Sequence, residues 1–121
     1  MGHVEVDAYI RGVMEEVELK RVIVDTGATY TVLPMELVEK IGAVKTPYTV
    51  DVELGDGRKI KTHIYVASIR IQEREAPSII VAFKEAKTVI GVQALEALGL
   101  KVDPTTGKLE PTRPEGLAYF Y

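Results

Sequence analysis

The sequence of 121 residues contains no cysteine and only two histidines, His3 and His63. The lack of cysteine excludes thiol catalysis, disulfide bonds and thiolate metal sites. Two histidines are too few to form a metal centre by themselves. We therefore expect no bound metal.

The sequence also lacks long runs of basic residues and long runs of apolar residues. The formal net charge is −3, and no basic block is longer than Arg58-Lys59, so the charge pattern gives no support for nucleic-acid or anionic-membrane binding. The longest apolar stretches, such as residues 78–83, fall well short of the roughly 18 residues that a membrane-spanning helix needs. The N-terminus turns acidic at Glu5 and lacks the pattern of a signal peptide. We expect a soluble cytoplasmic protein that binds neither nucleic acid nor membrane.

Length and hydrophobic patterning predict one small β-rich domain. A chain of this size buries roughly two thirds of its extended surface, which is enough for a single core, so we expect one domain over residues 1–121. Apolar and polar residues alternate along most of the chain, as a half-buried sheet requires. Examples of this alternation are Val17/Leu19, Val50/Val52/Leu54 and Ile60/Ile64/Val66.

Only two segments have the pattern of a helix. Residues 34–42 begin with a proline and end at a glycine, and residues 92–98 are followed by another glycine. Proline suits the first turn of a helix, and glycine suits the position just after its end. A turn over residues 103–107 is expected to join short strands at residues 100–102 and 108–110. The predicted class is mostly β with one or two short helices.

One short motif suggests a chemistry. The apolar run Val22-Ile23-Val24 ends in Asp25, which is followed by Thr26-Gly27-Ala28. A β-branched run gives a rigid approach, and Gly27 permits a sharp reversal. Such a segment presents one carboxylate at the mouth of a cleft, as half of an aspartic-protease active site requires. The other interpretation is an Asx turn, in which the carboxylate only bonds nearby backbone amides.

A hairpin is predicted around residues 54–58, with the sequence Leu-Gly-Asp-Gly-Arg. Its Asp-Gly pair accepts the positive φ angles of a tight two-residue turn between alternating strands. Without further context this is an ordinary surface hairpin. If Asp25 is catalytic, the position of the hairpin favours a flap over the substrate. The flap residues would be Leu54, Gly55, Asp56 and Gly57.

Together these segments resemble the retropepsin family, the retroviral-type aspartic proteases. The Asp-Thr-Gly-Ala element is followed by an apolar run at residues 30–33, the hairpin, and Val89-Ile90-Gly91 before a helix-like segment. The resemblance runs in order from about Val4 to about Pro111. It implies the retropepsin-like acid-protease fold, a small closed β-barrel with a flap hairpin, which works as a homodimer.

The chemistry of that family uses two carboxylates around one water, one taking its proton while the other bonds the substrate carbonyl. This chain offers only Asp25 in the required context, so a symmetric homodimer that pairs it with its twin is the simplest arrangement. Two carboxylates about 3 Å apart repel by roughly 5 to 6 kcal/mol at an effective dielectric near 20, so they would share one proton. The resemblance thus implies an aspartic endopeptidase with an acidic optimum, a peptide or protein substrate and no cofactor.

The resemblance also implies supporting roles. Thr26 would hydrogen-bond across the dimer axis, and Gly27 would let the substrate backbone approach closely. Val89, Ile90 and Gly91 would pack behind the catalytic loop, with Gly91 making room for it. A cleft lined by Ala28, Val89 and the flap would prefer apolar substrate side chains. Residues 4–10 and the aromatic tail at residues 117–121 would form a sheet between the subunits, unless the tail is a frayed terminus.

Two departures from the family pattern keep other functions open. Retropepsins commonly pair an acidic residue after Asp-Thr-Gly-Ala with an arginine after Ile-Gly, whereas this chain has Thr29 and Val92. The expected flap tip is also charged, at Asp56 and Arg58. The alternative function is a catalytically idle dimeric peptide-binding or scaffolding module on the same fold. A third interpretation is an ordinary β-domain with an accidental Asp-Thr-Gly.

Overall fold

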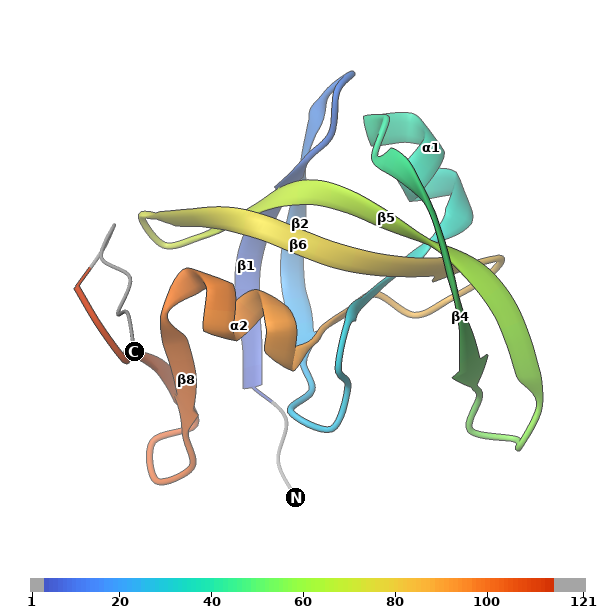
Figure 1. Cartoon of the computed structure of the whole chain (residues 1–121). Coiled ribbons are helices and arrows are strands. Elements are labelled where there is room, and N and C mark those ends of the chain that lie inside the picture. Colours follow the sequence, from blue (N-terminus) through green and yellow to red (C-terminus); the bar gives the residue numbers. More distant parts are fainter. Residues whose placement is uncertain (1–3, 115–121) are drawn as a thin grey trace, which may run out of the picture.

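The computed structural model describes residues 4–114, which fold mostly into β-strands with two short helices (Figure 1). This confirms the class predicted from the alternation and the glycine-capped segments. In chain order the elements are β1 (Val4–Arg11), β2 (Glu16–Val24), β3 (Thr31–Pro34), α1 (Met35–Ile41), β4 (Val44–Glu53), β5 (Lys59–Ile71), β6 (Arg74–Phe83), β7 (Val89–Ile90), α2 (Val92–Leu98), β8 (Leu100–Asp103) and β9 (Lys108–Pro111).

The first seven strands form one sheet in the order β1-β2-β7-β3-β6-β5-β4. Most neighbours are antiparallel, but β2 pairs with β7 and β3 pairs with β6 in parallel. The long strand β5 also pairs with β1 over Tyr9–Arg11, beside the region where it pairs with β4. The sheet therefore curves back on itself, and Figure 1 shows β5 and β6 crossing in front of β1 and β2.

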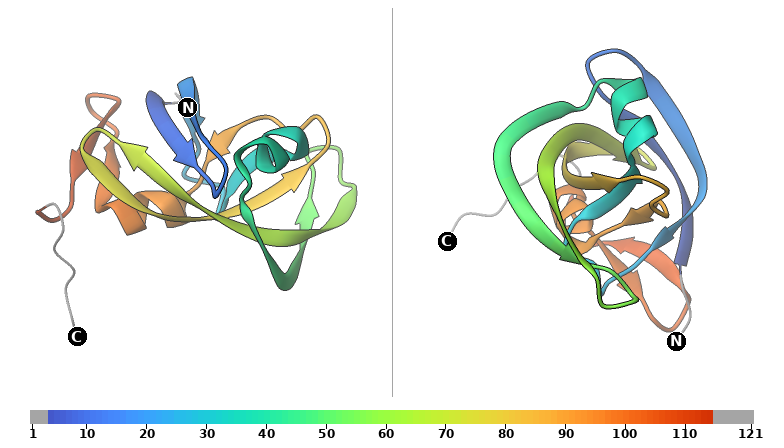
Figure 2. Two further views of the ribbon diagram at one scale, coloured as in Figure 1. Left: turned by 90° about the horizontal axis from the view of Figure 1, so that it is seen from above. Right: turned by 90° about the vertical axis from the view of Figure 1, so that its right-hand side faces the viewer.

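The core lies inside this curved sheet. Five of its central side chains come from five different strands and are completely inaccessible to solvent: Ile10, Leu33, Ile69, Ile80 and Ile90. Helix α2 adds Ala94, Leu95 and Leu98 to the same cluster and packs on β6 and β8 (Figure 2). Burial of large aliphatic side chains is the main stabilising term in such a domain.

Strand β5 departs from the predicted alternation in one respect. The sequence pattern puts Ile60, Ile64 and Val66 on one face, yet the buried positions toward the end of the strand are Tyr65, Ala67, Ile69 and Ile71. The face of β5 that is buried changes near His63, because the two halves of the strand have different neighbours. Its first half pairs with the edge strand β4, and its second half crosses the core beside β1.

Both helices end as predicted. Gly42 follows α1 with φ 71°, and Gly99 follows α2 with φ 73°, a left-handed conformation that glycine adopts without strain. The predicted turn at residues 103–107 joins β8 and β9, which form a separate two-stranded sheet. None of the helices in residues 4–114 has the length and apolarity to cross a membrane.

Two arginines fix the end of α2. The Arg74 guanidinium donates to the carbonyl oxygens of Leu98 and Gly99, and the Arg113 guanidinium donates to those of Glu96 and Ala97. Three of these carbonyls belong to the last turn of α2 and the fourth belongs to Gly99, which follows it. The last carbonyls of a helix have no N–H partner further along the helix. The two side chains thus tie the helix end to the start of β6 and to the segment after β9.

The termini were predicted to form a sheet between subunits. Within the chain, residues 4–10 lie in β1, which pairs with β2 along its length and with β5 at Tyr9–Arg11. Among residues 4–114, the edge of β1 that faces away from β2 has no neighbouring strand near residues 4–8. The tail at residues 117–121 lies outside the described residues.

The turn between β1 and β2 is held tightly against the end of α1. The backbone N–H groups of Val13 and Met14 donate to the carbonyls of Gly42 and Ile41, each at 2.9 Å. A Cβ on Gly12 would overlap the Ile41 carbonyl and lie 2.7 Å from the Gly42 carbonyl carbon. Only glycine fits at this contact.

We therefore predict that Gly12→Ala lowers the free energy of unfolding by about 2 to 3 kcal/mol, because backbone on both sides must move. Gly55→Ala is the matched control, since a Cβ there has nothing within 4 Å. It should change stability by less than about 0.5 kcal/mol. Urea unfolding of both variants makes the measurement, and equal midpoints for the two would contradict the prediction.

Candidate active site

Asp25 stands directly after β2, at the start of a tight turn. Its backbone N–H donates to the Ile90 carbonyl at 3.0 Å, and its carbonyl accepts the Ala28 N–H at 3.0 Å. The Asp25 side chain is half-buried, whereas Thr26 and Gly27 at the tip of the turn are exposed. The β2 strand and its parallel partner β7 thus hold a single carboxylate at the surface on a fixed backbone.

The carboxylate itself is oriented by its own turn. Asp25 Oδ1 accepts the Gly27 N–H at 2.8 Å, which is the Asx-turn geometry of the alternative interpretation. Oδ2 has no hydrogen bond within residues 4–114. The Asx bond and a chemical role are compatible, because the bond fixes one oxygen and leaves the other open to a water or a substrate.

The segment behind this loop makes close backbone contacts with it. The N–H groups of Val92 and Gln93 donate to the carbonyls of Ala28 and Thr29, at 2.8 and 3.0 Å. The start of α2 therefore finds its missing acceptors in the loop after Asp25. Val89 and Ile90 pair with Ile23 and Val24, so the structure brings the Val-Ile-Gly segment against the Asp-Thr-Gly-Ala element.

Gly91 is the closest point of this contact. A Cβ at this position would lie 2.5 Å from the Tyr30 carbonyl carbon and oxygen and 2.9 Å from the Ala28 carbonyl oxygen. Its N–H donates to the buried Thr31 hydroxyl at 3.3 Å. The structure thus explains why this position needs a glycine.

A cavity of about 510 Å³ opens beside Asp25. Its apolar wall is formed by one residue of the Asp25 loop and by residues of strands β3, β4 and β6: Ala28, Val32, Val50, Val52 and Val81. Polar groups are also on its border: Gly27, Thr29, Tyr30, Asp51 and Glu53. Asp51 and Glu53 are exposed, and Asp51 lies 3.7 Å from the Lys61 ammonium. Within residues 4–114, no three His, Asp or Glu side chains gather in a way that could hold a metal.

Two parts of the expected cleft, Val89 and the tip of the hairpin, are not among the residues that border this cavity. Val89 does not border it, because it sits in the short strand β7 between β2 and β3. The hairpin contributes residues 50–53 of β4 and not the tip residues 54–57. Leu54 instead borders a separate hollow, together with Arg58, Ile60 and residues 83–85. The sequence pattern that could have predicted the role of Val50 and Val52 in the cavity wall is their alternation, since residues two positions apart point to the same face of a strand.

The hairpin tip also differs from the predicted two-residue turn. Leu54 N–H donates to the Arg58 carbonyl at 2.7 Å, and Gly57 N–H donates to the Leu54 carbonyl at 2.9 Å. Within this loop only Gly57 has a positive φ, of 87°. This is a three-residue loop closed by a glycine bulge, so Asp56 does not need the left-handed conformation.

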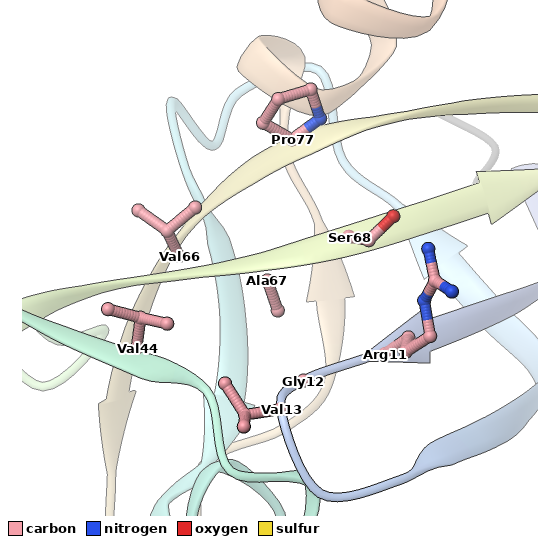
Figure 3. A pocket seen from close by; sticks show the side chains of 8 residues that line it. All are labelled: Arg11, Gly12, Val13, Val44, Val66, Ala67, Ser68 and Pro77. Atoms are coloured by element: carbon pink, nitrogen blue, oxygen red, sulfur yellow. The ribbon is translucent and has the colours of Figure 1, made fainter.

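A second hollow, of about 520 Å³, lies at the β1–β2 turn, with Val13, Val44, Val66 and Pro77 around it (Figure 3). Its polar border consists of Arg11 and Ser68, and Arg11 is paired with Glu75 at 3.1 Å. None of its lining residues, all of them within the described part of the chain, is a carboxylate. It cannot supply the acid–base chemistry that the Asp25 cavity offers.

Comparison with protein families identifies the class of this domain. Residues 10–99 match the family described as "gag-polyprotein putative aspartyl protease". The match spans well over half of the chain and includes the Asp25 loop, the hairpin and the β7 segment. The chain belongs to this retropepsin-like family of aspartyl-protease domains, which confirms the resemblance. Comparison with curated proteins gives no match.

We predict that Gly91→Ala destabilises the fold by about 2 to 3 kcal/mol, because its Cβ would press on the backbone of the loop after Asp25. Gly27→Ala is the contrast, since its Cβ would meet only the Asp25 carboxylate, at 3.2 Å. That variant should unfold close to wild type. The stability of both variants is measured by thermal unfolding, and the conformation of the loop by the amide chemical shifts of residues 25–30. A Gly91→Ala protein that is as stable as wild type and has wild-type shifts would contradict the prediction.

The hairpin tip yields a titration prediction. The Arg58 backbone N–H, and after it the Arg58 guanidinium at 2.7 Å, hold the pKa of the Asp56 carboxyl below its ordinary value. Any stabilisation from this group is present above the ordinary carboxyl range and is lost as the pH falls through the lowered pKa. In Arg58→Ala the pKa of Asp56 should rise only part of the way, because the larger cause, the backbone N–H, remains.

The measurement is an NMR titration of the Asp56 side-chain carboxyl carbon. Lys61→Ala is the control, since that ammonium lies beside Asp51. An Asp56 pKa that is the same in Arg58→Ala and wild type would show that the guanidinium has no part in the shift.

Proposed function

We propose that this chain is an aspartic endopeptidase that acts as a homodimer. In this proposal residues 1–121 form one closed-barrel domain, and each copy supplies one Asp25. The observation that carries the proposal is the placement of Asp25, whose carboxylate has one fixed and one open oxygen at the border of a cavity with an apolar wall. The family match supports the same class of activity.

A second copy of the chain is needed because the mechanism uses two carboxylates, and Asp25 is the one carboxylate among the described residues at the cavity that is held in a turn. Asp51 and Glu53 also border the cavity, but they lie on the edge strand β4 and are exposed. Neither is held in a turn as Asp25 is. The exposed tip formed by Thr26 and Gly27 leaves the loop accessible to the same loop of a partner, related by a twofold axis.

The reaction then needs only the two carboxylates and one water. Since two carboxylates about 3 Å apart repel by roughly 5 to 6 kcal/mol at an effective dielectric near 20, the pair holds one proton. The ionised Asp25 takes a proton from the water, whose oxygen attacks the peptide carbonyl carbon. The protonated Asp25 gives its proton to the carbonyl oxygen. The tetrahedral intermediate then collapses: the pair gives its remaining proton to the nitrogen, the C–N bond breaks, and one hydroxyl of the intermediate returns a proton to the pair as the C=O bond forms. The pair again holds one proton.

The substrate of this proposal is an extended peptide. Strand β4 is the last strand of the sheet order within the described residues, where its outer edge has unpaired backbone groups next to the Asp25 cavity. A peptide can add to this edge as a further strand. The half-buried valines of the wall, Val32, Val50 and Val52, favour an apolar side chain in the cavity.

One observation favours the second candidate function, a peptide-binding dimer without catalysis. The hairpin tip carries an ion pair between Asp56 and Arg58 at 2.7 Å, and both side chains are exposed. A charged tip excludes water from a peptide less well than an apolar tip does. In that function the dimer binds extended peptides but never cleaves them.

Cleavage of an unfolded protein substrate between pH 3 and pH 8 tests the proposal. We expect activity to peak in acid, to be blocked by a statine-type inhibitor, and to fall by more than about 1,000-fold in Asp25→Asn. Asp103→Asn is the matched control, because Asp103 accepts the Thr105 N–H at 2.9 Å in an Asx turn like that of Asp25. An asparagine keeps this acceptor in both turns, so folding should survive in both variants.

The outcomes separate the candidate functions. Acidic activity that disappears only in Asp25→Asn supports the peptidase. Folded dimers that bind peptide but are inert in both wild type and Asp25→Asn support the binding module. A wild-type monomer with no activity contradicts both, and cleavage that persists in Asp25→Asn assigns the reaction to another site.

A further inference from the structure

Gln93, the second residue of α2, bonds two separate parts of the proposed active site. Its backbone N–H donates to the Thr29 carbonyl at 3.0 Å, in the loop that follows Asp25. Its side-chain oxygen Oε1 accepts the Ile79 N–H at 2.8 Å, and its Nε2 donates to the Pro77 carbonyl at 3.3 Å. One residue therefore connects the catalytic loop to strand β6.

The side-chain amide takes the place of a neighbouring strand. Strand β3 pairs with β6 only from Ile80 onward, so the N–H of Ile79 and the carbonyl of Pro77 have no partner strand on that side within the described chain. A primary amide carries one acceptor and one donor group, which matches this pair of backbone groups. Ile79 is half-buried, and an unpaired N–H there would be costly.

The loop and strand β6, which Gln93 connects, both contribute residues to the border of the Asp25 cavity. Ala28 and Thr29 belong to the loop, and both are bonded to the first turn of α2. Val81 belongs to β6, two residues beyond Ile79, and contributes to the apolar wall. The position of α2 relative to β6 therefore contributes to the spacing between the loop and this wall, together with the pairing of β3 with β6 after the loop.

We propose that Gln93 is a positioning residue, whose side-chain amide fixes the distance of the Asp25 loop from the β6 wall of the cavity. The proposal rests on the proposed peptidase function for its effect on catalysis. Gln93 acts through the position of the Asp25 loop, so it need not touch the substrate. Misplacement of a reacting group by about 1 Å can cost roughly 100-fold in rate, which makes such a fixed spacing important.

The test compares Gln93→Met, which keeps the length of the side chain but lacks both hydrogen bonds, with Gln93→Glu. The control is Gln72→Met, because Gln72 is exposed in the turn between β5 and β6. We expect kcat to fall roughly 10- to 100-fold in Gln93→Met, with a smaller change in KM. Gln72→Met should stay within about twofold of wild type.

Gln93→Glu gives a signature that a general loss of stability would not produce. A protonated glutamic acid can accept from Ile79 and donate to Pro77, whereas a carboxylate can only accept and repels the Pro77 carbonyl. The ratio of Gln93→Glu activity to wild-type activity should therefore fall as the pH rises from 4 to 6. The corresponding ratio for Gln93→Met should stay constant over this range.

Amide hydrogen exchange provides a readout that does not depend on cleavage. In Gln93→Met the amides of Asp25 and Ala28 should exchange at least about 10-fold faster, while that of Ile69 in the core is unchanged. If these loop amides exchange as in wild type, the positioning role is wrong, whatever the activity. If the loop amides respond but wild type cleaves nothing, the positioning role stands and the peptidase function fails.

Discussion

The structure around Asp25 depends on one contact, the backbone-to-backbone approach of the residue 25–30 loop and the residue 90–93 segment. Three N–H groups, those of Asp25, Val92 and Gln93, are satisfied across this contact. The approach is possible only because Gly91 has no Cβ. A carboxylate that acts in general acid–base chemistry needs a position that is fixed before the substrate arrives, and these three hydrogen bonds join main-chain groups on both sides of the contact.

The same contact bears on the departures at Thr29 and Val92. In the viral enzymes a charged pair commonly joins these two positions, and a buried pair costs much desolvation energy unless it is fully bonded. Here the Thr29 carbonyl and the Val92 N–H take part in backbone hydrogen bonds between the same two segments. Neutral backbone bonds carry no such penalty, so the absence of both charged residues does not leave the Asp25 loop without support.

Local features were predictable from the sequence because they depend on neighbouring residues. The glycines after the helices, the β-branched run before Asp25 and the turn at residues 103–107 each act within a few positions. The change of buried face along β5 was not predictable, because it arises where β5 leaves β4 and meets β1. The bonds of Gln93 to Pro77 and Ile79 were missed for the same reason. A lone glutamine in an amphipathic helix gives no sign of which strand edge it will meet.

The charges of the hairpin have a second explanation in the edge position of β4. An exposed sheet edge invites strands of other copies, and proteins discourage this with charged side chains and proline on the edge strand. Strand β4 carries Lys45, Pro47, Asp51 and Glu53 at exposed positions, while Val50 and Val52 face the cavity side. In the proposed function, a peptide held between this edge and the Asp25 loop gains apolar contacts on the valine face, whereas a strand from another copy that pairs along the whole edge meets the proline and the charges. The charges of the hairpin are thus consistent with an edge that limits association between copies, and in the proposed function the stretch beside Asp25 accepts a substrate strand.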